Sequence, residues 1–534
     1  MAKILFINPV VREEDVPRHI PYGIALIASI CINRGHDVQV FDANAWRLGD
    51  DVLRNVCTAD KWEIIAIGGL TTTYGHIKKA VKIIKSECPA TPLIAGGGFL
   101  TSMPRDVMTW LPEIDFGIIG EAFETFPLLV EKIAREECNF EKFRGIVYRN
   151  QEVIKVNQPR ALLKDLDELP WPAWDLFPLE EVYFKNSSSL FSEEAYISQR
   201  RIDINGSFGC GLICRYCWHL GTTGDMVVEE NSSGQDDVKF TYGRHVRMHS
   251  PRYIVDMVKH LKNNYQVDFV NFLDENLMTV NTTSRHTWLE EICDLWVLEG
   301  LQPKSRKENR EVNENDLGDG VYWSGTSHAS LHYPSILKKM YEAGCTHLVY
   351  GLESFDPGIL KTLGKGSNRA NNIDSVEVCL DSGIKPIPNI IVGFPDETYK
   401  SIRNTIEALI ELQIHAKPHF ATAYPGSEWF NDYKTEITKQ YNGNLEDYVL
   451  DLGDASKITA TIAKNFTSIE LLGLQQIIAD RDLRNLDQAE NYTKLFRKQN
   501  TTLFSENPAE NFEKSKKKTA ISTVESTVLN AIIK

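Results

Sequence analysis

The chain has 534 residues, of which 42% are hydrophobic, so it is long enough for about two to four domains with packed cores. Its net charge of −15 argues against a nucleic-acid-binding surface, and no stretch approaches the ~18 consecutive apolar residues of a membrane span. The first residues, Met-Ala-Lys-Ile-Leu-Phe-Ile-Asn-Pro, predict a β-strand and not a signal peptide, because their apolar run is short. Ten cysteines without a secretion signal indicate a reducing compartment, which predicts a cytoplasmic protein.

Residues 1–140 alternate short apolar runs with amphipathic stretches. The expected strands are Lys3–Asn8, Asp37–Phe41, Glu63–Gly68, Pro92–Gly96 and Asp115–Ile119, and the expected helices include Tyr22–Asn33 and Gly75–Glu87. Short β-branched runs separated by helices predict a Rossmann-like parallel sheet with helices on both faces. Ligands of such sheets bind beyond the carboxyl ends of the strands.

Small residues gather at those carboxyl ends. They are Thr71 and Thr73 after the third strand, Gly96, Gly97 and Gly98 after the fourth, and Gly120 with Glu121 after the fifth. Glycines let a ligand approach the backbone closely, but they also serve tight strand-to-helix turns. The residues by themselves favour neither role over the other.

The rest of the chain divides at its connectors. A hairpin over Gly145–Val156 and a Pro-rich segment, Asp165–Asp175, predict a linker over 141–190, a third region over 191–426 and a fourth over 427–534. The fourth region is mainly helical and polar, with an amphipathic helix expected over Ser468–Leu486. Its end, Lys514–Lys534, is expected to be partly disordered.

Residues 191–426 contain six strand–helix units. The expected strands are Ala195–Asn205, Phe269–Asp274, Val321–Ser324, Thr346–Gly351, Lys385–Val392 and Pro418–Ala423, and the expected helices are Pro251–Asn263, Thr283–Leu298, Tyr333–Glu342 and Asn371–Ser382. Two polar insertions, Gly221–Arg247 and Lys304–Gly320, are long for such connections and predict lids, substrate loops or disordered stretches. His245, Arg247 and His249 end the first insertion, as either a cationic substrate clamp or part of a solvated loop.

Cys210, Cys214 and Cys217 share one short loop after the first of these strands, with the spacing C-x3-C-x2-C. A cluster of four irons needs four ligands, so three thiolates leave one iron open for a small molecule, much as catalytic zinc keeps an open position. A structural zinc site with His219 as the fourth ligand is one alternative, and a trio used for packing is another. The other seven cysteines are scattered and are expected in cores.

The cysteine loop resembles that of the radical S-adenosylmethionine (SAM) enzymes, and the six strand–helix units resemble their open (β/α)6 barrel. The resemblance implies a [4Fe–4S] cluster on the three cysteines whose open iron binds SAM. In that family an electron from the cluster splits SAM into methionine and a 5′-deoxyadenosyl radical. A flavodoxin- or ferredoxin-type protein is the implied electron donor.

Residues at the strand ends match the SAM-contacting positions of that family. They are Tyr216 in the cysteine loop, Asp274 and Glu275 after strand two, Glu353 and Ser354 after strand four, and Gly393 after strand five. Taken singly each match is weak, and Glu353 and Ser354 also precede Asp356-Pro357, a plausible helix cap.

Strand three departs from the family, because it ends in Thr326-Ser327-His328-Ala329 where relatives place an arginine. His328 can donate to the SAM carboxylate, but it titrates near neutrality and cannot make the bidentate fork of an arginine. A histidine packed into the barrel rim is an equal alternative.

Residues 1–140 resemble the cobalamin-binding domain that precedes many radical SAM domains. The similarity lies in Pro21–Ala25, Gly96–Thr101 and Gly120–Phe126, and it continues in the connector Asp165–Asp175. It implies cobalamin beside the threonines, the glycine loops and Glu121. The string Asp-x-His-x-x-Gly, whose histidine ligates cobalt, is absent, and His19 lies near the first loop without that pattern. Many members of this branch also lack it, and a domain that kept only the fold is the alternative.

The function that these features favour is cobalamin-dependent methyl transfer from SAM to an unactivated carbon of a small-molecule or lipid substrate. Oxidative cyclisation, as in the anaerobic Mg-protoporphyrin monomethyl ester cyclase, is the first alternative. A non-catalytic protein that binds an iron–sulfur cluster or zinc is the second, and the intact cysteine trio together with Glu353 and Gly393 argues against it.

Overall fold

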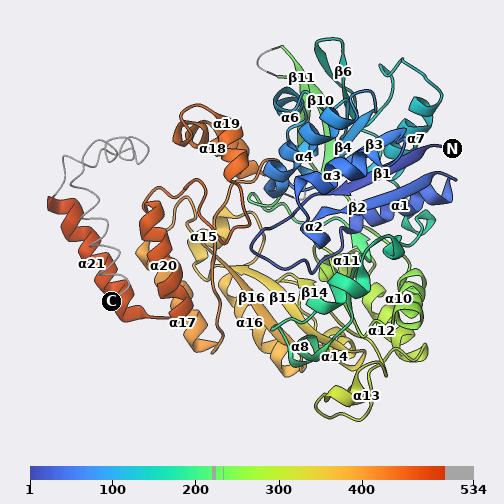
Figure 1. The fold of residues 1–534 in the computed structure, drawn as a ribbon. Helices are drawn as coiled ribbons and strands as arrows, with labels where there is room; N and C mark the ends of the chain where they lie inside the picture. The colour runs from blue at the N-terminus through green and yellow to red at the C-terminus, as the bar shows by residue number, and fades with distance from the viewer. Residues whose placement is uncertain (219–223, 232–233, 500–534) are drawn as a thin grey trace. The chain divides into compact units, whose positions relative to one another are not determined.

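The structure, a computed structural model, describes residues 1–218, 224–231 and 234–499, which form two compact units (Figure 1). Unit 1 comprises Met1–Gly211, Trp218–Thr326 and Ser335–His347, and unit 2 comprises Leu212–Cys217, Ser327–Pro334 and Leu348–Lys534. The predicted disorder of Lys514–Lys534 falls outside the described residues. Within those residues no helix is both long enough and apolar enough to cross a membrane.

The N-terminal region of unit 1 is built on a seven-stranded sheet with the order β2-β1-β3-β4-β5-β6-β7. Its strands are β1 (Lys3–Asn8), β2 (Asp37–Asp42), β3 (Ile64–Gly68), β4 (Leu93–Gly96), β5 (Phe116–Ile118), β6 (Ile146–Asn150) and β7 (Val153–Val156). The first five strands pair in parallel, which confirms the predicted Rossmann-like sheet. The predicted hairpin, β6 and β7, pairs antiparallel with β5 and so extends this sheet.

Helices cover both faces of this sheet. They are α1 (Tyr22–Asn33), α2 (Ala43–Trp46), α3 (Asp50–Thr58), α4 (Tyr74–Glu87), α5 (Gly98–Ser102), α6 (Pro104–Trp110) and α7 (Ala122–Ala134), with the 3-10 helix η1 (Thr71–Thr73) before α4. Side chains alternate along each strand, so Ile4 and Phe6 pack with residues of α1 and α7, whereas the buried Leu5 and Ile7 are on the opposite face. The Pro-rich connector forms short turns, η2 (Leu166–Glu168), η3 (Trp174–Leu176), η4 (Leu179–Tyr183) and η5 (Phe184–Asn186).

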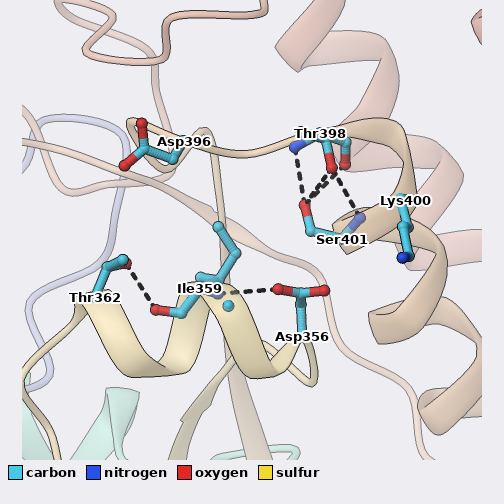
Figure 2. A pocket seen from close by; sticks show the side chains of 8 residues that line it. Asp356, Ile359, Thr362, Asp396, Thr398, Lys400 and Ser401 are labelled. Atoms are coloured by element: carbon cyan, nitrogen blue, oxygen red, sulfur yellow. Dashed lines mark hydrogen bonds between the residues drawn. The ribbon is translucent and has the colours of Figure 1, made fainter.

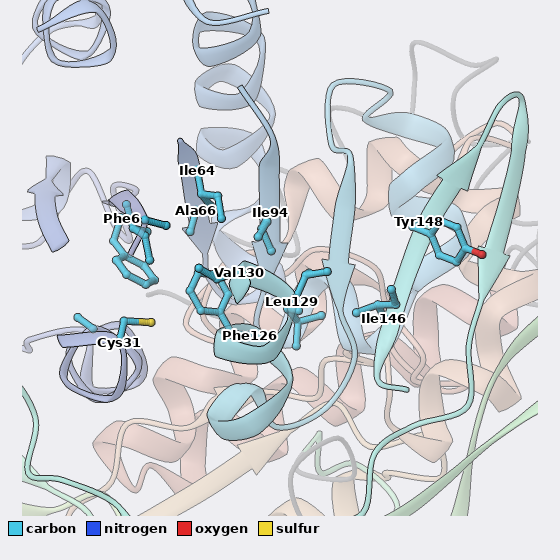
Figure 3. Packing of buried hydrophobic residues seen from close by; sticks show 14 residues of the cluster. Phe6, Cys31, Ile64, Ala66, Ile94, Phe126, Leu129, Val130, Ile146 and Tyr148 are labelled. Atoms are coloured by element: carbon cyan, nitrogen blue, oxygen red, sulfur yellow. The ribbon is translucent and has the colours of Figure 1, made fainter. Parts of the chain in front are cut away.

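The core on the α1 and α7 side is a single apolar cluster (Figure 3). Phe126, Leu129 and Val130 of α7 project onto alternate residues of the central strands, among them Ile64 and Ile94. This packing fixes the sheet whose carboxyl ends carry the glycine loops.

The second sheet has six strands in the order β17-β16-β15-β14-β13-β8. They are β8 (Arg201–Ile204), β13 (Phe269–Phe272), β14 (Tyr322–Ser327), β15 (Cys345–Glu353), β16 (Lys385–Val392) and β17 (His419–Phe420). The helices between them are α10 (Pro251–Tyr265), α11 (Leu277–Thr283), α12 (Trp288–Leu298), α13 (Lys304–Lys307), α14 (Pro334–Glu342), α15 (Pro357–Thr362), α16 (Arg369–Asp381) and α17 (Tyr399–Glu411). Six strands separated by helices confirm the predicted partial barrel.

Two predicted elements of the barrel are wrong in extent. The first three residues of the expected strand Ala195–Asn205 are the end of helix α8 (Glu193–Ile197), which begins where the Ser192 side chain accepts the Ala195 N–H. The expected helix Thr283–Leu298 is broken into α11 and α12, because Arg285 and His286 hold positive φ angles of 61° and 66°. Local caps and turns decided both cases.

The first insertion is a hairpin of β10 (Gly224–Glu230) and β11 (Asp236–Arg244), paired antiparallel. It is attached to the N-terminal region of unit 1. Arg105 donates to the Asp236 carbonyl at 2.9 Å, and Gln158 donates to the Val228 carbonyl at 3.1 Å. The described part of this insertion is therefore ordered. The second insertion contains α13 and the 3-10 helix η6 (Glu314–Asp316), held by Arg310 on Asp316 at 2.6 Å.

The last region is helical, as predicted, with α18 (Glu428–Gln440), α19 (Leu445–Asp451), α20 (Ser468–Asp480) and α21 (Leu483–Gln499). The single helix expected over Ser468–Leu486 is two helices, because Arg481 ends α20 in the left-handed conformation with φ of 56°. The helix α20 begins with a capping box between Thr467 and Glu470.

We expect Leu129→Ala to lower the free energy of unfolding of unit 1 by about 2–5 kcal/mol, because Leu129 is fully buried and its removal leaves a cavity in the apolar cluster. Denaturant titration followed by circular dichroism measures the change. Leu48→Ala is the matched control, since Leu48 is 51% exposed, and it should cost less than about 0.5 kcal/mol. Equal losses in the two variants would contradict the described packing.

Candidate functional site

The cysteine loop follows a tight turn. Its entry is β9 (Ser207–Phe208), which pairs with β12 (Arg247–Met248). At Gly209 the φ angle is 110°, and a β-carbon would lie 2.0 Å from the carbonyl oxygen of His245, so only glycine fits. Cys210 is buried, and Cys214 and Cys217 are half-buried and joined by a bond from the Cys217 N–H to the Cys214 carbonyl.

Cys210 belongs to unit 1, and Cys214 and Cys217 belong to unit 2. Across the described residues, no three histidine, cysteine or carboxylate side chains converge as a preformed metal site. The assignment of the three cysteines as cluster ligands therefore stays a prediction from their spacing. His219, the fourth ligand of the zinc alternative, lies outside the described residues.

A buried ion pair stands at the end of β15 in unit 2. Lys365 Nζ lies 2.5 Å from Glu353 Oε1, and the two side chains are 6% and 4% exposed. Tyr216 Oη donates to the same oxygen at 2.8 Å, and Lys365 also donates to the Gly351 carbonyl. Glu353 has a φ of 60°, which is uncommon for a residue with a β-carbon and is typical of strained functional positions.

The other carboxylate oxygen of Glu353, Oε2, is buried and receives no hydrogen bond from any described residue. Such an unsatisfied acceptor costs about 1–3 kcal/mol. A ligand that brings an N–H or O–H donor would remove that cost. The atom that makes Glu353 a ligand-binding candidate is thus Oε2.

His328 is buried near Lys365. Its Nδ1 accepts hydrogen bonds from the Ser330 N–H at 3.1 Å and the Ser330 hydroxyl at 2.7 Å, which places the ring proton on Nε2. Burial, and then the positive charge of Lys365, lower the pKa of His328 to about 3. At neutral pH the ring is uncharged, so His328 does not supply the cation of the missing arginine.

Lys365 supplies that buried cation, and the sequence analysis missed it. A signal was present, because Lys365 stands between Gly364 and Gly366, whose φ angles are 67° and 77°. Two glycines in the left-handed region turn the chain sharply after α15 and bring the lysine back to the end of β15.

Ser354 and Gly393, two further predicted SAM residues, have structural partners. The Ser354 hydroxyl lies 3.2 Å from the Thr405 hydroxyl and accepts the Asp356 N–H at 3.1 Å, while Asp356 caps α15 as the alternative reading proposed. The Gly393 N–H donates to Glu397 Oε2 at 2.5 Å, and burial raises the pKa of Glu397 to about 8. Gly393 has a φ of 95°, and a β-carbon there would be 3.1 Å from Leu471.

Asp274 fastens the chain before the cysteine loop. It is 1% exposed, accepts the Gly206 N–H at 2.8 Å, and accepts a short hydrogen bond from the Ser207 hydroxyl. Burial raises the pKa of Asp274 to about 6, although these hydrogen bonds act in the opposite direction. The neighbouring predicted residue, Glu275, is exposed.

The glycine loops of the N-terminal region have structural reasons of their own. A β-carbon on Gly97 would lie 2.4 Å from the Gly69 carbonyl oxygen, and Gly97 has a φ of 96°. The Gly120 N–H donates to the Thr101 hydroxyl at 3.1 Å. Thr73 is buried and donates to the Leu70 carbonyl at 2.8 Å. Thr71, in the same turn, is also buried, whereas Gly96 has no crowded neighbour.

Trp218, the residue after Cys217, packs on these loops within unit 1, and sequence reasoning did not identify it. A β-carbon on Gly98 would lie 2.5 Å from the indole, so glycine makes room for Trp218. The indole N–H donates to the Ser102 hydroxyl at 2.5 Å. The end of the cysteine loop is thereby attached to the predicted cobalamin loops.

Exposed apolar side chains follow the carboxyl ends of three adjacent parallel strands. Val16 follows β1, Trp46 and Leu48 follow β2, and Leu70 follows β3, and each is 44–51% exposed. This edge is the one at which a parallel sheet binds its ligands.

The cationic clamp predicted from His245, Arg247 and His249 is wrong, and so is the solvated loop. Arg247 forms a two-pronged pair with Glu121, with Nη1 at 3.0 Å from Oε2, and both side chains are 10% exposed. His249 stacks on Tyr253 and lies 3.2 Å from Asp167, and burial lowers its pKa to about 4. The carboxylate of Glu121, a predicted cobalamin residue, is therefore paired with Arg247.

A hollow lies between the amino ends of α15 and α17 in unit 2 (Figure 2). Its lining is polar at the rim, with Asp356, Asp396 and Lys400 among its residues. None of the predicted site residues lines it, and its hydrogen bonds are those of helix caps. It adds nothing to the candidate site.

Comparison with known families gives two matches. The radical SAM superfamily matches residues 204–409, and the B12 binding domain matches residues 9–130. An uncharacterized methyltransferase of Pyrococcus horikoshii is 26% identical over 80% of this chain and 82% of its own. The anaerobic magnesium-protoporphyrin IX monomethyl ester cyclase of Synechocystis is 21% identical over 79% of this chain and 77% of its own.

Two solved structures share the fold. The cobalamin-dependent S-adenosylmethionine radical enzyme OxsB superposes with a TM-score of 0.65 over all of this chain and 72% of its own, at 13% identity. The radical S-adenosylmethionine methyltransferase TsrM from Kitasatospora setae superposes with a TM-score of 0.59 over 82% of this chain and 77% of its own, at 14% identity. At these identities the likeness is one of fold.

We expect Lys365→Met to destabilise the protein by about 3–5 kcal/mol, because it leaves the Glu353 carboxylate buried without a cation. Adding Glu353→Gln should recover most of the loss, and chemical denaturation measures both. In the single variant the loss should shrink as the pH falls, because protonation removes the uncompensated charge.

The control for that variant is Lys464→Met, which breaks a pair with Asp396 whose side chains are both 57% exposed. It should change the free energy of unfolding by less than about 1 kcal/mol. A double variant that is no more stable than Lys365→Met would show that the two buried side chains are not coupled.

Proposed function

Since the chain is a radical SAM enzyme with an N-terminal B12-binding domain, we propose that it transfers a methyl group from SAM to an unactivated carbon of a small-molecule or lipid substrate. The observation that carries this is the unsatisfied Oε2 of Glu353 beside the buried cation of Lys365. SAM presents a carboxylate and N–H and O–H donors. An acceptor without a donor and a buried ammonium group are complementary to it.

For SAM we assign three residues of unit 2. Glu353 Oε2 accepts a hydrogen bond from the amino group or ribose, and Lys365 attracts the carboxylate in place of the family's arginine. Tyr216 orients Glu353 through its hydroxyl, which lies 2.8 Å from Oε1. Burial, and then the negative charge of Glu353, raise the pKa of Tyr216 well above its usual range, so the hydroxyl keeps the proton that it donates.

For the cluster we assign the thiolates of Cys210, Cys214 and Cys217. When bound, the cluster supplies the electron for SAM cleavage and cobalamin carries the methyl group. A flavodoxin- or ferredoxin-type protein in the cytoplasm is the proposed electron source. Asp274 and Glu397 have an indirect role, since their carboxylates accept hydrogen bonds from the backbone N–H groups of Gly206 and Gly393 and so fix that backbone.

For cobalamin we assign the edge of the N-terminal sheet with Thr71, Thr73, Gly96, Gly97, Gly98 and Gly120. The apolar side chains Leu70 and Trp46 suit the methylated rim of a corrin, and Trp218 on Gly98 lies next in sequence to the cysteine loop. The chain lacks the Asp-x-His-x-x-Gly string, and His19 Nδ1 is 2.6 Å from Asp203, so we assign no protein ligand to cobalt.

Oxidative cyclisation is the second candidate, and the similarity to the Synechocystis cyclase over 79% of this chain favours it. Both functions begin with cleavage of SAM to a 5′-deoxyadenosyl radical, and methyl transfer also uses SAM as the methyl donor. Product mass separates them, because methyl transfer adds one carbon and two hydrogens to the substrate, whereas cyclisation adds no carbon.

We expect the change of Cys210, Cys214 and Cys217 together to alanine to abolish both the iron–sulfur absorbance and the formation of 5′-deoxyadenosine after anaerobic reconstitution. Cys138→Ala is the control, since this cysteine is exposed, and it should keep both. A triple variant that retains a full complement of iron and sulfide would overturn the assignment. Tight zinc in the wild type would favour the structural alternative.

We expect the anaerobic protein to retain hydroxocobalamin after desalting, without the absorbance change of histidine ligation. Gly98→Val should reduce retention, because its side chain displaces Trp218 from the loop. Gly443→Val is the control, since Gly443 has open space around it and lies in the last region, although its φ of 88° strains any side chain. If the wild type retains no corrin, the N-terminal domain is a scaffold only.

A further inference from the structure

A row of polar side chains crosses one face of three neighbouring strands in unit 1. Asp203 on β8, Asn271 on β13 and Ser324 on β14 are register partners. Asn271 Nδ2 donates to Asp203 Oδ1 at 3.0 Å, and Ser324 Oγ donates to Asn271 Oδ1 at 2.9 Å.

The opposite face of these strands is apolar. There Trp323 of β14 packs against Trp296 of α12 at 6.1 Å between ring centroids. Because side chains alternate along a strand, the polar row is on the face turned away from α12. That face is the inner face of the partial barrel.

Arg201 lies on the same face as Asp203, two residues earlier on the edge strand β8. Its side chain is half-buried, and the guanidinium group makes no hydrogen bond or ion pair with a described residue, although the negative charge of Asp203 acts on it. A guanidinium group has five N–H donors, so leaving it without acceptors in a half-buried place is costly. Burial lowers the pKa of Arg201, but arginine remains charged at neutral pH.

The one nearby carboxylate is already used. Asp203 accepts from Asn271 and lies 2.6 Å from His19 Nδ1. Burial acts to raise the pKa of Asp203, but His19, Arg201 and Asn271 outweigh it and lower that pKa, so the carboxylate stays ionised. Arg18 is exposed beside His19, and its charge also lowers the pKa of Arg201. Asp203 is thus the carboxylate whose charge acts on Arg201, and His19 and Asn271 already occupy it, so the charges of Arg201 and Arg18 leave an excess of positive charge.

We propose that Arg201, with Arg18 and His19 beside it, binds an anionic group of the substrate, either a carboxylate or a phosphate. A guanidinium group binds both of these in a two-pronged manner. This inference adds a substrate class to the proposed methyl transfer. It rests on that proposed function, because the bound anion is a substrate only if the protein catalyses the reaction.

The position of Arg201 also sets a minimum length for the substrate. Ile204, the last residue of β8, is three steps along the strand from Arg201, a distance of about 10 Å. The carbon that reacts at the carboxyl edge of the barrel and the anionic group are therefore about 10 Å apart. A substrate shorter than that does not reach both places.

The test compares Arg201→Gln with Arg200→Gln in the full-length reconstituted protein. Arg200 is the matched control, because it neighbours Arg201 on the chain but is fully paired, with Nε donating to the Tyr265 carbonyl at 2.6 Å and Nη1 to Glu180 at 2.9 Å. The probes are inorganic phosphate and succinate, at constant ionic strength with sodium chloride. The measurements are the melting temperature and the rate at which phenylglyoxal modifies Arg201, followed by peptide mass spectrometry.

We expect one of the two anions to slow the modification of Arg201 about tenfold and to raise the melting temperature of the wild type and of Arg200→Gln, but not that of Arg201→Gln. The effective anion separates a phosphate from a carboxylate site. Without anions, Arg201→Gln should melt at or above the wild-type temperature, and Arg200→Gln below it.

Failure to protect Arg201 by either anion, or equal anion effects in the wild type and Arg201→Gln, overturns the proposal. A melting temperature of Arg201→Gln as low as that of Arg200→Gln also overturns it, because Arg201 would then be structural. None of these measurements needs SAM cleavage. A negative result in these measurements therefore does not contradict the proposed methyl transfer. Absence of 5′-deoxyadenosine from the wild type would count against methyl transfer but not against the anion site.

Discussion

The ligands of a parallel sheet bind chiefly at the carboxyl ends of its strands, because helices or the sheet itself enclose much of the rest. Both sheets of this protein obey that constraint. The glycine loops, the exposed apolar residues and η1 follow strands of the first sheet, and Asp274, Glu353 and Gly393 follow strands of the second. Local chemistry then decides which of these residues face a ligand and which only shape the edge.

Buried charge separates those two groups. Glu353 keeps one oxygen for Lys365 and Tyr216 and leaves the other without a donor among the described residues. Asp274 and Glu397 instead accept backbone N–H groups, which fixes the turns that follow β8 and β16. A buried carboxylate oxygen without a donor is a candidate for ligand binding, whereas a carboxylate that accepts backbone N–H groups stabilises a turn.

The sequence predicted most of this architecture because periodicity and turn residues are local. The bounds of β1, α1 and β16 were predicted to the residue. What failed were the breaks at Arg285–His286 and Arg481, where a residue other than glycine takes a left-handed conformation without a sequence signal. Such positions depend on the tertiary contacts around them.

The candidate site was predicted less completely, because partners of side chains are not local. Glu353 was singled out as a SAM residue, which stays a prediction, but its ion-pair partner Lys365 was missed, since the two residues meet only in the folded chain. Glu121 was expected at a cofactor, yet it pairs with Arg247, which is 126 residues away. A motif therefore identified which strand ends matter, whereas the structure identified which atoms remain available.

The hairpin β10–β11 has a consequence for how the protein is divided. It belongs by sequence to the barrel, but Arg105 and Gln158 of the N-terminal region hold it, and Trp218 and Arg247 on either side of it pack on Gly98 and Glu121. The N-terminal sheet and the first half of the barrel are thus joined by a segment that leaves the barrel, contacts the N-terminal region and returns to the barrel. A fragment ended in the Pro-rich connector would keep the sheet but lose the chain that covers it, which agrees with the place of both regions in one compact unit.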